Sequence, residues 1–258
     1  MAKKIKDMNR FCFFTAILAI AMMSSGVVVH AQTTEPRVFG NNDGFFVITN
    51  NKAQFYEYEW ESESYNYDSK YDFALPNGYK NVYGFKDFLA FIVNNKLQMY
   101  EFNGASWVVF SGVPEFALPD GYERVFSGRE KGVICVIVNN KIQIYGNNGR
   151  IWGTRPAIDF TLPSGYKNVF GGGDSFGLAV GNKAQFYEFT SAKGWTADSR
   201  YDLSLPNGYR YVFGSKDSFM RWSKVFVVFD DSVQVYSFDR DNNKWETDSD
   251  WVFKLPKN

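Results

Sequence analysis

Val169–Pro206 reads VFGGGDSFGLAVGNKAQFYEFTSAKGWTADSRYDLSLP, and the same pattern occurs five times along the chain. Each unit begins with a valine, an aromatic residue and a small residue, and each ends in Leu-Pro. The opening valines lie 44, 43, 44 and 43 residues apart, at Val38, Val82, Val125, Val169 and Val212. The closing leucines are Leu75, Leu118, Leu162, Leu205 and Leu255. A period of this length indicates a repeat architecture.

Each unit has the periodicity of β-strands. An apolar run such as Phe176 to Val180 follows the opening motif, and short continuous runs suit strands that are covered on both faces. A two-residue turn of Asn, Gly or Asp comes next, and these residues tolerate the positive φ of a tight hairpin. The turns are Asn50-Asn51, Asn94-Asn95, Asn139-Asn140, Gly181-Asn182 and Asp230-Asp231. An alternating return strand, a longer loop and a last strand such as Tyr71 to Leu75 complete the unit; the last strand ends at the proline, which cannot donate to a ladder.

About four strands in each of five units predict an all-β chain that folds as a five-bladed β-propeller. Five repeats of about 43–44 residues would each supply one blade. An open β-solenoid is the alternative, but it usually needs atypical capping repeats, and the sequence shows none. We expect a single propeller domain over residues 32–258, with repeats at about 35–76, 77–119, 120–163, 164–206 and 207–258.

Residues 1–31 have the pattern of a secretory signal peptide. Basic residues from Lys3 to Arg10 precede an apolar stretch, Phe11 to Val29, and small residues at Val29 and Ala31 mark a cleavage site before Gln32. An uncleaved membrane anchor is the alternative. We therefore expect export to the periplasm, the cell surface or the medium.

Cleavage would change the chemistry that the chain can perform. It would leave 24 basic and 27 acidic residues, a net charge of −3, which gives no footprint for nucleic acid. His30, the only histidine, would be lost with Cys12, so that Cys135 would be the sole cysteine and no internal disulfide could form. Without histidine there is no Ser-His-Asp or Cys-His arrangement, and we predict that the protein is not an enzyme. A glycoside hydrolase that uses two carboxylates is the remaining catalytic alternative.

Three polar positions recur in every unit: an acid five residues after the valine, a glutamine after the hairpin turn, and a tyrosine two residues further on. The acids are Asp43, Asp87, Glu130, Asp174 and Asp217. The Gln-Tyr pairs run from Gln54 and Tyr56 to Gln234 and Tyr236. A further acid (Asp72, Glu115, Asp159, Asp202) is replaced by Val252 in the fifth unit. Hydrogen bonding that holds neighbouring blades together is the structural interpretation of all these positions, because unsatisfied buried polar groups are costly.

The functional interpretation joins the acids to the tryptophans. Trp107, Trp152, Trp195 and Trp245 stand ten or eleven residues before Leu-Pro. An acid beside such a ring between two blades could hold sugar hydroxyls while the ring stacks on the sugar. Packing of the tryptophans in the core is the alternative. Five acids around one mouth of the propeller would suit Ca²⁺; no other cofactor is indicated.

Two departures from the repeat are further candidates, because exposed aromatic residues beside charge on a loop are often binding features. Trp60 lies in a loop of unit one, Glu57 to Tyr67. Trp222 lies in an insertion of unit five, Met220 to Lys224.

In architecture, Arg37 to Pro256 resembles the five-bladed tachylectin-2-type lectins, and the strands leading to Gly-Tyr turns are similar to hemopexin repeats. The glycine-tryptophan signatures of the first and the Asp-Ala opening of the second are absent, so no binding residue is carried over. We predict a lectin-like, non-catalytic module that binds glycans at repeated sites between blades. A protein-interaction or structural surface propeller is the alternative, with a surface protein as its partner.

Overall fold

The computed structural model describes residues 38–41, 44–59, 61–62, 64–126, 132–148, 151–172, 174–216, 222–247 and 252–256. The chain divides into two compact units, Met1–Thr34 and Glu35–Asn258, and the account below concerns the second. The predicted signal peptide and the candidate residues Asp43, Trp60, Glu130 and Asp217 lie outside the described residues. Within the described part of the chain, no helix has the length and hydropathy needed to cross a membrane.

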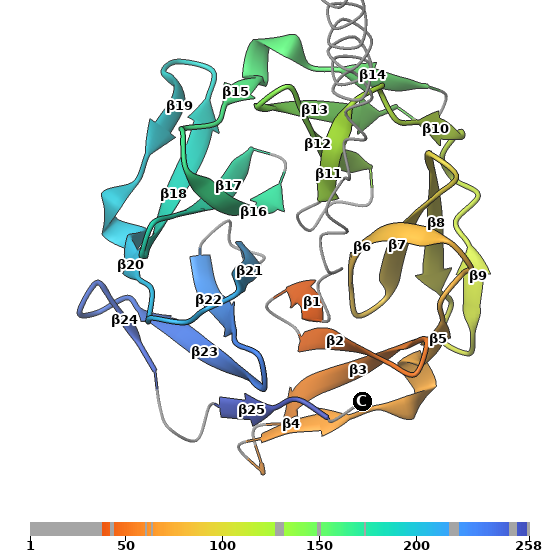
Figure 1. The fold of residues 1–258 in the computed structure, drawn as a ribbon, viewed down its shortest axis with the longest axis horizontal. Helices are drawn as coiled ribbons and strands as arrows, with labels where there is room; N and C mark the ends of the chain where they lie inside the picture. The colour runs from red at the N-terminus through yellow and green to blue at the C-terminus, as the bar shows by residue number, and fades with distance from the viewer. Residues whose placement is uncertain are drawn as a thin grey trace, which may run out of the picture. The chain divides into compact units, whose positions relative to one another are not determined.

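Glu35–Asn258 is a five-bladed β-propeller, as predicted: five antiparallel sheets form a ring, and each sheet is built from one repeat (Figure 1). The innermost strands are β1 (Val38–Asn41), β6 (Tyr79–Phe85), β11 (Tyr122–Phe126), β16 (Tyr166–Gly172) and β21 (Tyr211–Lys216). The second strands are β2 (Gly44–Thr49), β7 (Phe88–Val93), β12 (Val133–Val138), β17 (Ser175–Val180) and β22 (Trp222–Val228). The third strands are β3 (Lys52–Glu59), β8 (Lys96–Phe102), β13 (Lys141–Asn147), β18 (Lys183–Thr190) and β23 (Ser232–Asp239).

The outer edge of each blade differs from the prediction, because it consists of two short strands instead of one. The first pieces are β4 (Ser64–Tyr67), β9 (Trp107–Val109), β14 (Trp152–Thr154), β19 (Gly194–Ala197) and β24 (Lys244–Glu246). The second pieces are β5 (Phe73–Ala74), β10 (Phe116–Ala117), β15 (Phe160–Thr161), β20 (Leu203–Ser204) and β25 (Val252–Lys254). Both pieces pair with the same third strand. Short 3₁₀ turns separate them in three blades: η1 (Ser69–Tyr71), η2 (Pro156–Ile158) and η3 (Ser199–Tyr201).

The turns between second and third strands confirm the expected positive φ in three blades and at one residue of a fourth. Both asparagines have a positive φ at Asn50-Asn51, Asn94-Asn95 and Asn139-Asn140, whereas in blade 4 Gly181 has a positive φ and Asn182 does not. The prediction is wrong for Asp230 and Asp231, neither of which has a positive φ.

The Leu-Pro motif recurs together with the turn because the two are hydrogen-bonded. The leucine N–H donates to the carbonyl of the second turn residue in every blade, at 2.7–3.1 Å. The pairs are Leu75 with Asn51, Leu118 with Asn95, Leu162 with Asn140, Leu205 with Asn182, and Leu255 with Asp231. This bond brings the chain back from the outer edge to the start of the next blade.

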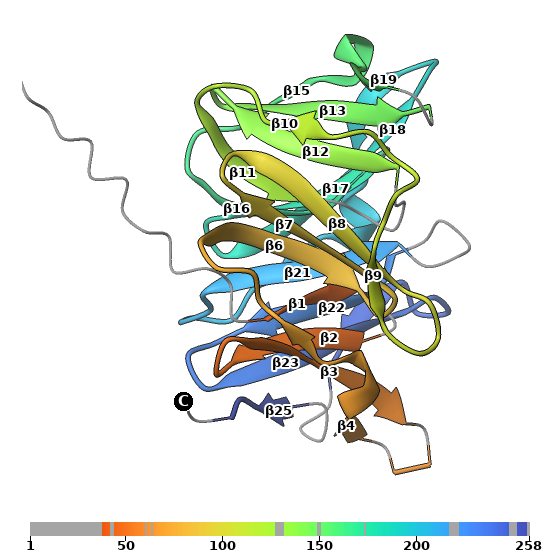
Figure 2. The same cartoon turned by 90° about the vertical axis from the view of Figure 1, so that its right-hand side faces the viewer.

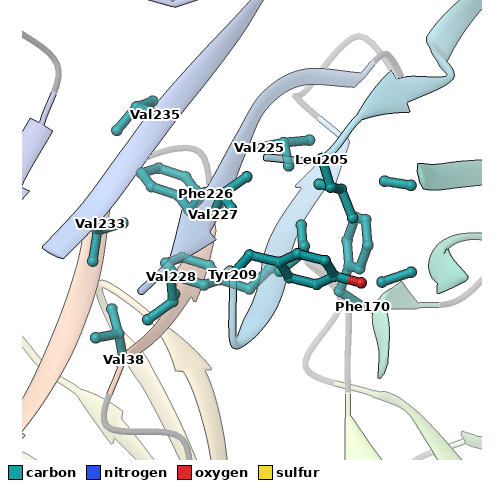
Figure 3. Close-up of a cluster of buried hydrophobic side chains, with 14 of the residues drawn as sticks. Val38, Phe170, Leu205, Tyr209, Val225, Phe226, Val227, Val228, Val233 and Val235 are labelled. Carbon is teal, nitrogen blue, oxygen red and sulfur yellow. The ribbon is translucent and has the colours of Figure 1, made fainter. Parts of the chain in front are cut away.

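Side chains from neighbouring blades form the core, and the side view in Figure 2 shows adjacent sheets lying face to face. The second strands of blades 2 and 3 are buried on both faces, which is why they read as continuous apolar runs. Figure 3 shows the cluster in which Val38 of blade 1 packs beside valines of β22 and β23 in blade 5. In the same cluster Phe45 of blade 1 lies 5.7 Å from Phe226 of blade 5, between ring centroids.

The innermost strands are joined by the side chain that precedes the opening valine. Asn168 donates to the carbonyl of Val212 in the next blade (2.8 Å) and accepts from its N–H (3.0 Å). Asn81 donates to the carbonyl of Val125 at 3.1 Å. The Tyr211 hydroxyl links blade 5 to blade 1, because it donates to Val38 O (3.0 Å) and accepts from Val38 N–H (2.8 Å).

No strand is shared between the first and last blades within the described residues, since β25 pairs with β23 of its own sheet. The ring therefore closes through side chains.

Both irregular segments are more regular than predicted. The unit-one loop is a hairpin in which Glu57–Glu59 pairs with Ser64–Asn66. In unit five, Trp222 to Lys224 begins strand β22 and pairs with β21, so Trp222 does not lie on a loop.

Replacing Tyr211 with Phe should lower the free energy of unfolding by about 1–3 kcal/mol, because both polar groups of Val38 lose their partner. Urea denaturation of the Glu35–Asn258 protein measures the change. Tyr236→Phe is the matched control: its hydroxyl makes a single 3.3 Å bond to Gln234 within one blade. Equal losses in the two variants would contradict a special role for Tyr211 in closure.

Candidate functional site

One face of every third strand carries the repeated glutamine and tyrosine, because residues two apart on a strand share a face. In blades 1 to 4 a lysine precedes the glutamine on the same face, at Lys52, Lys96, Lys141 and Lys183. The acid that comes just before the second outer piece meets this lysine. We call these four side chains the Lys–Gln–Tyr–acid group of a blade. Its members are Lys52, Gln54, Tyr56 and Asp72 in blade 1; Lys96, Gln98, Tyr100 and Glu115 in blade 2; Lys141, Gln143, Tyr145 and Asp159 in blade 3; and Lys183, Gln185, Tyr187 and Asp202 in blade 4.

The lysine and the acid are ion-paired in blades 1, 2 and 4. Lys52 Nζ lies 3.4 Å from Asp72 Oδ2, and Lys183 Nζ lies 3.2 Å from Asp202 Oδ2. Lys96 pairs with Glu115 in blade 2. Because these pairs are partly exposed to water, each contributes little to stability. The pairing keeps these three groups close to electrically neutral.

The tyrosine of each group packs against the preceding blade. Tyr100 lies 4.8 Å from Phe73 of blade 1, and Tyr187 lies 5.0 Å from Phe160 of blade 3. The first and last blades meet in the same way, with Tyr56 4.6 Å from Phe253. These contacts support the structural interpretation of the tyrosine, which holds neighbouring blades together.

In blades 3 and 4 the glutamine contacts the tyrosine hydroxyl of its own group. Tyr145 OH donates to Gln143 Oε1 at 2.9 Å, and Tyr187 OH donates to Gln185 Oε1 at 3.5 Å. Burial raises the pKa of both phenols, and the nearby acid raises it further, so both donate as neutral hydroxyls. Both glutamine side chains are half-buried.

The predicted tryptophan platforms serve as blade-to-blade donors. Each indole N–H donates to a backbone carbonyl of the preceding blade, at 2.7–3.1 Å. The bonds run from Trp107 to Tyr71, from Trp152 to Pro114, from Trp195 to Ile158, and from Trp245 to Tyr201. The rings are half-buried among aromatic neighbours such as Phe160, 5.9 Å from Trp195. No ligand is needed to account for their recurrence.

Of the five acids predicted after the valine, the structure describes Asp87 and Asp174. Both are exposed in turns between the innermost and second strands. Their backbone carbonyls accept from Phe102 N–H (3.0 Å) and Phe189 N–H (2.8 Å). Phe102 and Phe189 pack on Trp107 and Trp195, with ring centroids 5.5 and 5.4 Å apart. The acids are thus connected to the tryptophans through their backbone carbonyls and a phenylalanine, and a sugar site shared by the acid side chain and the indole stays a prediction.

The described residues include no cluster of three or more His, Cys, Asp or Glu side chains able to hold a metal ion. The predicted Ca²⁺ ring includes Asp43, Glu130 and Asp217, which lie outside the described residues, and it stays a prediction.

Blade 5 lacks two members of the group at once. Ser232 replaces the lysine and Val252 replaces the acid, while Gln234 and Tyr236 are kept. Gln234 instead donates to Thr247 Oγ1 at 3.1 Å. The lysine and the acid are thus absent from the same blade, and four blades carry the complete group.

The repeated lysine was missed by the sequence reasoning, although its signal was present. It occurs in the four units that have the later acid and is absent from the unit that lacks it. The residue that faces the group's tyrosine on the outer strand was also missed, since strand register could not be assigned from the sequence.

The comparisons with known proteins show no family for this chain. Neither a protein-family model nor a curated protein sequence matches the chain. A functionally unknown protein from Desulfotomaculum acetoxidans is similar in structure, at 14% identity over 83% of this chain and 67% of that chain, with a TM-score of 0.40. Hsv2 from Kluyveromyces lactis is similar at 13% identity over 85% and 81%, with a TM-score of 0.41. A protein from Lactobacillus plantarum is similar at 10% identity over 80% and 67%, with a TM-score of 0.38.

At TM-scores below 0.5 these likenesses carry no argument about fold or function. The five-bladed propeller rests on the five sheets of the structure itself, and the finer resemblance to tachylectin-2-type lectins or hemopexin repeats stays a prediction.

Asp159→Asn should leave the melting temperature at pH 7 equal to or above that of the unchanged protein. Burial raises the pKa of Asp159, with the Lys141 charge acting in the opposite direction. A raised pKa in the folded state means that ionisation weakens folding, so stability rises as the pH falls through that pKa. Calorimetric melting between pH 3 and 7 measures the effect.

Any advantage of Asp159→Asn should disappear at low pH, where the unchanged carboxyl is protonated. Asp202→Asn is the control, because Asp202 is paired with Lys183 at 3.2 Å. A lower melting temperature for Asp159→Asn at pH 7 would show that the Lys141 charge outweighs the burial of the carboxyl.

Proposed function

We propose that the protein is an exported, non-catalytic binding module that recognises glycans at its Lys–Gln–Tyr–acid groups. The observation that carries the proposal is that four blades repeat the complete group, with half-buried glutamines in blades 1, 3 and 4 and an exposed one in blade 2. A fold needs no lysine–acid pair that is this exposed, because such pairs add little stability.

The chemistry of the group suits sugar hydroxyls. A carboxylate accepts, an ammonium donates, and an amide does both, so the group offers both kinds of partner within one strand face. The tyrosine and the phenylalanine of the preceding blade supply apolar surface beside them, as Tyr187 and Phe160 do. In this proposal the tryptophans belong to the frame, because their N–H groups already hold the blades together.

The non-catalytic part of the proposal rests on the sequence. After cleavage before Gln32 the chain would contain no histidine. The acids mostly follow the repeat, whereas a glycosidase needs two carboxyl groups with different roles. Identical groups on four blades favour repeated binding over one catalytic centre.

A protein-interaction surface is the second candidate, and exposed apolar side chains favour it. Val109 on the outer strand of blade 2 is 68% exposed, and Ile151 of blade 3 is 64% exposed. Single exposed apolar residues are common, so this observation weighs less than a group that four blades repeat.

Glycan-array binding followed by titration calorimetry tests the proposal. A combined variant with alanine at Gln54, Gln98, Gln143 and Gln185 should lose glycan binding while its thermal unfolding stays cooperative. Gln234→Ala is the control, because blade 5 lacks the lysine and the acid, and it should bind as the unchanged protein does. Binding that persists in the combined variant, or no glycan binding by the unchanged protein, would contradict the proposal.

Export predicts a defined new N-terminus. Expression of the full chain should yield a protein that begins at Gln32, because signal peptidase selects small residues at the two positions occupied by Val29 and Ala31. Intact-mass measurement and N-terminal sequencing of the exported protein identify the start. Ala31→Arg should block this processing; a product that keeps residues 1–31 without that substitution would favour the anchor.

A further inference from the structure

The four complete groups differ at one neighbouring position. On the first outer strand piece, the residue that pairs with the group's tyrosine is Tyr67, Val109, Thr154 and Ala197 in blades 1 to 4. Paired residues on neighbouring strands project to the same side of the sheet. Each of the four is exposed, so the position forms a variable wall beside a constant polar group.

Blade 1 is the only one of the four with an aromatic residue at this wall. Tyr67 is 44% exposed, and its ring centroid lies 5.7 Å from that of Tyr56. Its hydroxyl donates to Asp72 Oδ2 at 2.7 Å, which positions the ring directly beside the Lys–Gln–Tyr–acid group. Val109, Thr154 and Ala197 have no flat face on which a sugar ring could stack.

Blade 1 also contains a buried carboxylate oxygen to which no hydrogen bond is donated within the described residues. Asp72 Oδ1 is buried and has no hydrogen-bond partner among the described residues, although Oδ2 accepts from both Lys52 and Tyr67. A buried carboxylate oxygen without a hydrogen-bond donor lowers the stability of the fold. A ligand hydroxyl that donated to Oδ1 would remove this cost, and this gain would add to the affinity of the site.

The charges of the blade 1 group favour a neutral ligand. Asp72 is paired with Lys52 at 3.4 Å, so the group itself has no net charge that would select an acidic sugar.

We infer that the wall position sets the sugar preference of each group, and that the blade 1 group, with Tyr67 as its stacking face, is the tightest site and takes a neutral pyranose. This inference rests on the proposed function, because it assigns the ligand class of the same groups. The chain then has one strong and three weaker sites in place of equal ones.

Saturation-transfer NMR and calorimetry with methyl β-glucopyranoside, methyl β-galactopyranoside and glucuronic acid test the inference on the Glu35–Asn258 protein. Tyr67→Ala should weaken binding of the neutral glycosides about tenfold, whereas Tyr67→Phe, which keeps the ring, should weaken it less. Val109→Tyr should create a second tight site and raise the measured stoichiometry. Thermal unfolding of each variant separates loss of the site from loss of the fold.

The outcomes distinguish a failure of the proposed glycan binding from a failure of the proposed role of the wall position. If the neutral glycosides bind and the combined glutamine variant loses them, but Tyr67→Ala and Val109→Tyr change nothing, glycan binding stands and the wall inference is overturned. A preference for glucuronic acid would overturn the neutral ligand class. If no sugar binds the unchanged protein, both levels fail.

Discussion

The exposed backbone edge of the innermost strands is the constraint on which the ring depends. Each of these strands pairs with its own sheet on one side only, so its other edge presents N–H and C=O groups that need partners. The side chain before the opening valine supplies them across the blade boundary, as Asn168 does for Val212. At the boundary between the last and first blades, Tyr211 does the same for Val38 with a single hydroxyl. Since no strand is shared there within the described residues, this bond and the aromatic contacts of Phe45 and Tyr56 hold the two ends of the repeat together.

Closure in this form gives every blade two unlike faces. On one face of blade 1, Ala53 and Phe55 are fully buried against the next blade, whereas the face that carries Gln54 and Tyr56 meets the preceding blade only in part. The tryptophan covers one end of that face and donates to the preceding blade. At the other end the lysine and the acid reach water. The Lys–Gln–Tyr–acid group thus lies where the packed interface meets the surface, and a ligand could reach it there without separating the blades.

The repeat spacing, the hairpin turns and the Leu-Pro ends predicted the number of blades and the order of their strands correctly. The same reasoning placed Trp222 on a loop although it begins β22, because its unit is longer and the register of that pair is set by tertiary contacts. The sequence also predicted a positive φ at Asp230-Asp231, because aspartate tolerates that conformation. Neither residue adopts it, so tolerance of a positive φ does not by itself fix the turn type. The sequence reasoning named the tryptophans and the acids as joint sites but could not see that each indole N–H is already engaged, since the acceptor lies 36 to 44 residues away.

What the sequence determined by itself is the frame, since five copies of one pattern with strand periodicity and tight turns leave a ring of sheets as the consistent packing. Only the tertiary structure shows which repeated polar residues already make hydrogen bonds between blades and which could still contact a ligand. The difference depends on strand register and on the side chains of the neighbouring blade. Trp195 and Tyr187 both meet side chains of blade 3 that no local pattern specifies. Tyr67 lies beside Asp72 because it pairs with Tyr56 across the strands. The repeat pattern does not specify this pairing, since the residue at the position of Tyr67 differs from blade to blade.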